Sequence, residues 1–158
     1  MIKLTRIDDR LLHGQVAFTW VPALGVDCLV VANDKIAKDE FQKMTINLAK
    51  PANTKLFIKA IGDAITFLND EKNTKLKMLV LVNSIRDAAT LSAGVTEIKS
   101  VNFGGIRGKE GSRLISKAIA ITDEDIPLIK QMSAASIELE IRQVPTDSKQ
   151  FVEILLEK

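Results

Sequence analysis

Short apolar runs bounded by polar residues, glycine or proline alternate along the chain with segments in which apolar residues recur three or four positions apart. The first pattern is typical of β-strands and the second of amphipathic helices. The runs predict strands at 2–8, 27–33, 54–60, 76–82, 97–103, 114–121 and 137–144. The intervening segments predict helices at 11–24, 34–50, 62–69, 85–92, 122–135 and 147–156. Asp34, Ser84 and Thr122 are the predicted N-caps of three of these helices.

This alternation predicts an α/β fold: a doubly wound, mostly parallel open sheet of about seven strands with helices on both faces. The strand at 114–121 is the least regular, because its first residues also fit the start of a helix. No change of composition marks a linker, so we expect residues 1–158 to form a single domain.

In an open parallel sheet, ligands bind beyond the carboxyl ends of the strands. Asn83 and Ser84 follow the fourth predicted strand, and Gly104 and Gly105 follow the fifth. The loop after the first strand carries the most chemistry, since it holds two carboxylates, a guanidinium and an imidazole. Its members are Asp8, Asp9, Arg10, His13, Gly14 and Gln15.

Composition narrows the chemistry further. The chain has 158 residues, of which 46% are hydrophobic and 27% charged, which indicates a globular protein. Its 22 basic and 20 acidic residues nearly cancel, so no nucleic-acid partner is expected. A single Cys excludes an intrachain disulfide and a Cys-clustered metal site, and the lack of a long apolar run predicts a cytoplasmic location. Because there is one histidine and no tyrosine, His13 is the candidate for nucleophilic or acid–base work near neutral pH.

The loop after the first strand suits phosphoryl transfer. A neutral imidazole attacks phosphoryl groups, which makes His13 the candidate nucleophile. Arg10 can neutralise phosphate oxygens, and Asp8 or Asp9 can accept a hydrogen bond from the other ring nitrogen. Gly14 lets a backbone approach without a Cβ in the way, and this chemistry calls for no metal or cofactor. The alternative is a small-ligand or nucleotide-binding α/β module in which His13 is structural.

The segment from Arg6 to Val16, RIDDRLLHGQV, resembles the phosphorylation-site segment of the IIB components of the mannose/fructose/sorbose family of the sugar phosphotransferase system (PTS). Trp20 and the stretch NFGG at 102–105 also fit that family, and the resemblance covers the whole chain. It implies a doubly wound sheet in which the first strand is central and is flanked by the fourth and fifth.

The resemblance also implies a function. His13 would accept a phosphoryl group from a phosphohistidine on a IIA domain. It would pass that group to a sugar carried by the membrane components IIC and IID, with which the protein would associate peripherally. Arg10 would lie beside the phosphohistidine, and Asp8 would help to hold the loop. The remaining members of the predicted phosphate loop are Asp9, Gly14 and Gln15. The sequence leaves open the sugar, the ring nitrogen that is phosphorylated and the oligomeric state, a homo-oligomer included.

Three further features have structural interpretations. Cys28 lies inside an apolar strand, which favours core packing over phosphocysteine chemistry. The loop from Gly104 to Gly111 lacks the lysine and hydroxyl placement of a P-loop, which argues against nucleotide binding. Its glycine pair is predicted to permit close approach to the His13 loop or to form a mobile edge. Trp20 is expected to be partly buried on the first helix, with a place in a partner interface as the alternative.

Overall fold

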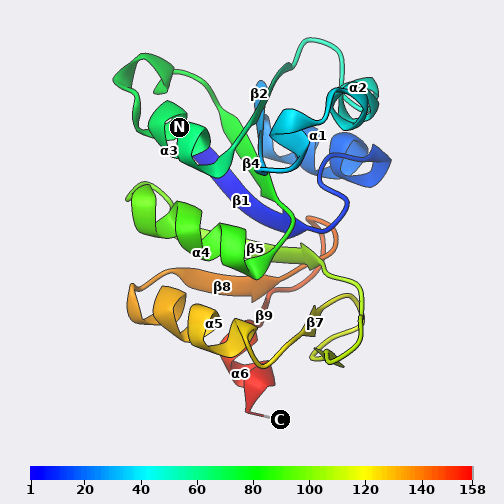
Figure 1. Ribbon diagram of the computed structural model, residues 1–158, viewed down its shortest axis with the longest axis vertical. Helices are drawn as coiled ribbons and strands as arrows, with labels where there is room; N and C mark the ends of the chain where they lie inside the picture. The colour runs from blue at the N-terminus through cyan, green and yellow to red at the C-terminus, as the bar shows by residue number, and fades with distance from the viewer. Residues whose placement is uncertain (158) are drawn as a thin grey trace.

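The computed structural model describes residues 1–157. Their main sheet has seven strands in the order β3-β2-β4-β1-β5-β8-β9 (Figure 1). The strands are β1 Ile2–Asp8, β2 Cys28–Ala32, β3 Lys55–Lys59, β4 Met78–Val82, β5 Ser100–Gly105, β8 Glu138–Ile141 and β9 Gln150–Phe151. Neighbouring strands are parallel except for β8 and β9, which are antiparallel. The predicted α/β fold with a mostly parallel sheet is confirmed.

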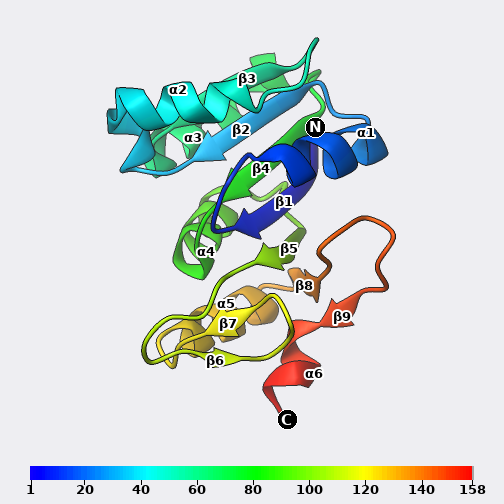
Figure 2. The same cartoon turned by 90° about the vertical axis from the view of Figure 1, so that its right-hand side faces the viewer.

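Helices cover both faces of the sheet (Figures 1 and 2). One face carries a π-helical turn, η1 Val16–Trp20, which continues into α1 Val21–Leu24, together with α2 Glu40–Leu48. The opposite face carries α3 Ile61–Asn69, α4 Ile85–Gly94, α5 Asp125–Ala134 and α6 Val152–Leu156. Two short 3-10 turns are η2 Ile36–Lys38 and η3 Glu71–Asn73. No helix within residues 1–157 has the length and apolar character needed to cross a bilayer.

Two separate apolar clusters hold these layers together, because successive side chains of a strand point to opposite faces. Val80 and Val82 of β4 pack with α3 and α4, whereas Leu79 and Leu81 pack with η1 and α2. Every residue of β2 and β4 is buried, as expected for parallel strands covered on both faces. The sheet thus has its most apolar strands at its centre and its helices wound on both sides.

The seventh strand is not the one that the sequence predicted. Residues 114–121 lie outside the main sheet, where β6 Arg113–Leu114 and β7 Ala120–Ile121 form a small antiparallel pair (Figure 2). Conversely, the predicted helix 147–156 contains β9, and only its last part is helical, as α6. Both errors concern short segments at the margin of the sheet, where tertiary contacts outweigh local propensity.

Two of the three predicted N-caps are also wrong. Asp34 precedes a 3-10 turn, and its carboxylate accepts a hydrogen bond from the amide of Ile61 at 2.8 Å, so it serves α3 instead of α2. Thr122 does not cap α5, which begins after a turn. Ser84 is confirmed as the N-cap of α4, because its hydroxyl accepts a hydrogen bond from the amide of Asp87 at 3.1 Å.

Candidate active site

The carboxyl end of β1 lies at the middle of the sheet. β1 pairs with β4 on one side and with β5 on the other, as the family resemblance implied. The chain leaves β1 toward the face that carries α1, and it leaves β4 toward the face that carries α4. Divergent connections of this kind open a crevice at the carboxyl edge of a parallel sheet, where ligands bind. The loop after β1 therefore stands where the fold offers a site.

This loop is held in a specific shape by a buried turn. The predicted helix 11–24 begins late, with η1, and Leu11 has a left-handed φ of 58°. Such a backbone conformation costs a residue with a Cβ about 1–2 kcal/mol. The Leu11 side chain is only 2% exposed and packs together with Leu12 in the cluster that lies beneath α2, and this burial offsets the cost. As a result, His13 turns back toward the end of β1.

Asp8 is the centre of the site. Its carboxylate is buried, and its Oδ2 lies 3.0 Å from Nε2 of His13. The same oxygen accepts a hydrogen bond from Nη2 of Arg6 at 3.2 Å, and Oδ1 accepts one from the amide of Arg10 at 3.1 Å. Because an ionised carboxylate only accepts hydrogen bonds, this contact places the ring proton of neutral His13 on Nε2. The lone pair then resides on Nδ1, which has no hydrogen-bond partner among the described residues.

His13 opens into a cavity of about 470 Å³. The cavity is lined on one side by Arg10 and Arg107, and on the other by α2, including the largely exposed ring of Phe41. Asn83, at the carboxyl end of β4, also contributes to the wall. Two guanidinium groups beside an imidazole nitrogen suit a phosphoryl group, whose oxygens carry the charge. The structure places Arg10 and His13 on the wall of the same cavity.

Asp9 has a different role from its neighbour. Its Oδ2 accepts hydrogen bonds from the amide and from Nε of Arg107, at 2.8 and 3.0 Å, and its own amide donates to the carbonyl of Gly105 at 2.8 Å. The structure therefore assigns the histidine contact to Asp8, which settles the choice that the sequence left open between the two carboxylates. Asp9 instead ties the loop after β1 to the loop after β5.

Three other predicted site residues have smaller parts in the structure. Gln15 lines a second cavity, of about 380 Å³, which borders Asp8 and Arg10 on the side of β5. A Cβ at Gly14 would meet only the ring of Phe18, at an ordinary 3.8 Å, so packing of the folded chain does not itself require glycine there. Ser84 does not line either cavity, because its hydroxyl is used at the start of α4.

The glycine pair at the end of β5 permits close packing, although the tight contact is with Arg6 of β1 and not with the His13 loop. A Cβ on Gly104 would overlap the guanidinium of Arg6, and one on Gly105 would stand 3.7 Å from the Asp8 carboxylate. Gly104 is therefore required by a buried side chain of β1. The pair brings the backbone of β5 against the residues that hold His13.

Sequence reasoning missed Arg6 as part of the site. This arginine is 1% exposed and donates to Asp8 from the middle strand of the sheet. Burial lowers the pKa of its guanidinium, and the charge of Asp8 opposes that shift. The available signal was an arginine in a strand that the family resemblance placed at the centre of the sheet, because a buried guanidinium has to find a partner. Arg107 and Phe41 gave no such signal, since an exposed loop cation and an exposed helix residue are ordinary.

Trp20 is fully buried, whereas the sequence predicted only partial burial, so its ring presents no surface to a partner. The guanidinium groups of Arg6 and Arg142 both lie over this ring, at 5.0 and 5.2 Å from its centroid. Its indole N–H donates to the carbonyl of Gln143 at 3.0 Å. Cys28 is buried in β2, where burial raises the pKa of its thiol to about 11, so it is not a nucleophile near neutral pH.

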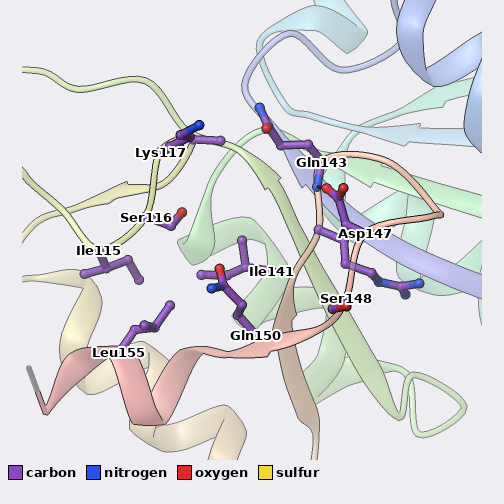
Figure 3. A pocket seen from close by; sticks show the side chains of 11 residues that line it. Ile115, Ser116, Lys117, Ile141, Gln143, Asp147, Ser148, Gln150 and Leu155 are labelled. Atoms are coloured by element: carbon purple, nitrogen blue, oxygen red, sulfur yellow. Dashed lines mark hydrogen bonds between the residues drawn. The ribbon is translucent and has the colours of Figure 1, made fainter.

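A further cavity, of about 470 Å³, lies between β8, α6 and the loop around residue 147 (Figure 3). It contains no imidazole or thiol. The carboxylate of Asp147 accepts hydrogen bonds from the amides of Gln143 and Val144, so it serves to shape its own loop. The candidate chemistry is therefore at His13. No group of three or more His, Cys, Asp or Glu side chains within the described part of the chain is placed to hold a metal ion.

Comparison with known proteins identifies the class to which this fold and site belong. Residues 2–158 match the family described as "PTS system sorbose subfamily IIB component". The chain is 33% identical over 155 residues to the PTS system fructose-specific EIIB component of Bacillus subtilis, covering 98% of this chain and 95% of that protein. It is also 33% identical over 149 residues to the PTS system mannose-specific EIIAB component of Escherichia coli K12, covering 94% of this chain and 46% of that longer protein.

A solved structure shares the fold of this chain. The crystal structure of the IIBSor domain of the sorbose permease from Klebsiella pneumoniae has the same fold, with a TM-score of 0.94 at 24% identity, covering 99% of this chain and 96% of that one. The chain belongs to the sorbose subfamily of PTS IIB components. It is thus a phosphotransferase component and a phosphoryl carrier of a sugar transport system, and the family resemblance seen in the segment from Arg6 to Val16 is confirmed.

Proposed function

We propose that His13 carries the phosphoryl group and that the group is attached to Nδ1. The observation that carries this proposal is the contact between Nε2 and the buried carboxylate of Asp8, which leaves Nδ1 as the other ring nitrogen of a residue that lines a cavity with Arg10 and Arg107. We further propose that residues 1–158 act as a single domain and that the transfer takes place in the cytoplasm.

The step is a displacement at phosphorus. The lone pair of Nδ1 attacks the phosphoryl group of a phosphohistidine on the donor, and the P–N bond of the donor breaks. The leaving imidazole of the donor takes back the electron pair of that bond. The proton on Nε2 of His13 stays in place, and the Asp8 carboxylate stabilises the positive charge that the substituted ring acquires. The guanidinium groups of Arg10 and Arg107 stabilise the charge on the phosphoryl oxygens. The P–N bond is already activated, so positioning and charge stabilisation supply most of what the step needs.

The donor in this proposal is a IIA domain, and the final acceptor is a hydroxyl of a sugar presented by membrane components IIC and IID. The Escherichia coli relative is named as a IIAB component, and this chain spans 46% of its length, which supports a IIA domain as the neighbour in the relay. The IIA donor and the sugar acceptor both have to reach Nδ1 of His13. Phe41 lines the cavity of His13, and Phe18 stands over Gly14 with 83% of its surface exposed. Any protein that reaches Nδ1 therefore contacts an apolar rim beside it.

Nucleotide binding receives no such support. A phosphate-binding glycine loop holds its backbone amides open to the ligand. Here Gly104 and Gly105 belong to strand β5, Gly104 packs on the guanidinium of Arg6, and the carbonyl of Gly105 accepts a hydrogen bond from the amide of Asp9. The loop that follows is tied down by the contact between Asp9 and Arg107.

The test is to map the adduct on the wild-type protein. Incubation with a phosphorylated IIA domain is expected to add the mass of one phosphoryl group, which acid removes and alkali does not. Peptide mapping is expected to place it on His13, and ¹⁵N NMR of the labelled ring is expected to place phosphorus on Nδ1. An adduct on another residue would refute the proposal for His13. An adduct on Nε2 of His13 would refute only the assignment of the nitrogen.

Replacing Arg10 with alanine is expected to slow both the arrival and the departure of the phosphoryl group by about 100-fold, the effect of removing one oxyanion donor. Its side chain is 54% exposed and its Nε lies 3.9 Å from Asp8, so the free energy of unfolding should change by less than about 1 kcal/mol. Rapid-quench labelling and denaturant unfolding measure the two quantities.

Lys3→Ala is the matched control for Arg10→Ala, since it removes an exposed cation at the opposite end of the same strand. This control should transfer at the wild-type rate. If Arg10→Ala transfers as fast as Lys3→Ala, Arg10 has no role in the reaction.

A further inference from the structure

The Arg6 guanidinium is buried and is held from several sides. Nη1 donates to Oδ1 of Asn102 at 2.7 Å and to the carbonyl of Arg142 at 3.1 Å. Nη2 donates to Asp8 at 3.2 Å and to the carbonyl of Gln143 at 3.2 Å. The group therefore connects β1 with β5 and with the segment that follows β8. It does not contact the surface of the cavity where His13 opens, because Arg6 is absent from that lining.

The position of the Arg6 guanidinium is fixed by the residues packed around it. Trp20 covers one face of the group, and the backbone of Gly104 lies so close that a Cβ there would overlap it. Arg142 also lies over the Trp20 ring, and it makes a bidentate ion pair with Glu140 at 2.8 and 2.9 Å. The two arginines thus stack on one indole ring and pair with two different carboxylates. Of these two carboxylates, only that of Asp8, the partner of Arg6, contacts His13.

We propose that Arg6 is a positioning residue for phosphoryl transfer, acting through Asp8 on His13. This inference rests on the proposed role of His13. Arg6 fixes the direction of Oδ2 of Asp8, and that oxygen fixes the plane and the proton of the His13 ring. The contacts with Asn102 and with the carbonyls of Arg142 and Gln143 make the geometry of the nucleophile depend on β5 and on the segment after β8.

Charge gives Arg6 a second effect on the same ring. The ionised groups around Asp8 and His13 are Arg6 on β1, Arg10 in the loop, and the Asp9–Arg107 pair across the cavity. Arg6 is the only buried cation among them. Without it, no buried cation pairs with the Asp8 carboxylate, and the oxygen that holds the ring proton of His13 on Nε2 is no longer fixed from the side of β1.

The experiment compares three folded variants with the wild-type protein. Arg6→Met removes the charge, and Arg6→Lys keeps one charge but cannot span Asp8, Asn102 and the two carbonyls. Arg142→Lys is the matched control, because it makes the same change in the other arginine stacked on Trp20 and leaves Asp8 untouched. With phosphorylated IIA as substrate, kcat is expected to fall by about 10- to 100-fold in Arg6→Met and less in Arg6→Lys, while KM stays within about twofold.

A second measurement reports on the ring itself. In the unphosphorylated wild-type protein at mildly alkaline pH, ¹⁵N NMR should show a protonated Nε2 and a Nδ1 that carries a lone pair. In Arg6→Met the lone-pair signal of Nδ1 should weaken, because a ring that Asp8 no longer orients populates both tautomers. Arg142→Lys should match the wild type in both kcat and ring signals. A purely structural role for Arg6 would lower stability without moving these signals.

Gly104→Ala keeps the proposal testable if Arg6→Met does not fold, because it displaces the guanidinium and retains its charge. It is expected to lower kcat and to disturb the Nδ1 signal in the same direction. The inference is overturned if a folded Arg6→Met, or Gly104→Ala in its place, has wild-type kcat and ring signals. It is also overturned if kcat falls as far in Arg142→Lys as it does in Arg6→Lys. Neither outcome bears on the proposed role of His13. That proposal is refuted separately, if the phosphoryl adduct maps to another residue.

Discussion

Replacing His13 with alanine is expected to abolish the acceptance of a phosphoryl group from a phosphorylated IIA domain. The chain has no second imidazole that could serve as acceptor. The fold should survive, because the ring is at the surface end of the site and Asp8 keeps its contacts with Arg6 and with the amide of Arg10. Losing one hydrogen bond to a charged group should lower the free energy of unfolding by about 2 kcal/mol. Mass spectrometry of the protein after incubation with the donor, and its denaturant midpoint, measure both effects.

Cys28→Ala is the control for His13→Ala. The thiol is buried and its pKa is raised to about 11, so its loss should leave labelling unchanged. If the His13→Ala protein still takes up an acid-labile phosphoryl group, the acceptor lies elsewhere. Loss of labelling in Cys28→Ala, with His13 present and the fold intact, would point to a phosphocysteine instead.

Replacing Asp8 with alanine is expected to damage both the fold and the reaction. Arg6 would be left as a buried charge without its carboxylate, and breaking a buried ion pair from one side costs about 3–5 kcal/mol. His13 would lose the contact that orients its ring and holds the proton on Nε2. Loss of such orientation should lower the transfer rate by about 100-fold. Denaturant unfolding and rapid-quench labelling of the folded fraction separate the two effects.

Two further variants, Asp9→Asn and Asp8→Asn, compare how much each carboxylate contributes to stability. Asp9 pairs with an exposed arginine, so Asp9→Asn should change the free energy of unfolding by no more than about 1 kcal/mol. Asp8→Asn retains an oxygen that accepts from His13 but not the charge that pairs with Arg6, and should be intermediate in stability between the wild type and Asp8→Ala. Equal losses of stability in Asp9→Asn and Asp8→Ala would contradict the central place given to Asp8.

The fold was predictable to the extent that its strands are buried on both faces. β2 and β4 are uninterrupted apolar runs, and their identity follows from period and length alone. The short pieces at the margin, β6, β7 and β9, were not predictable in this way. They are two residues long each, and their state depends on which neighbour offers backbone hydrogen bonds. The same reason explains Asp34, whose carboxylate reaches a helix that begins 27 positions later.

Local composition and the order of residues along the chain were enough to predict the class of fold, the loop that carries the chemistry and the single histidine within it. The same stretch of chain carried the family motif from Arg6 to Val16. Three-dimensional contacts were needed to distinguish Asp8 from Asp9, to bring Arg6 and Gly104 into the support of His13, and to bury Trp20 against two arginines. These relations join residues from β1, β5 and the segment after β8, and a hydrogen bond between distant residues leaves no periodicity in the sequence.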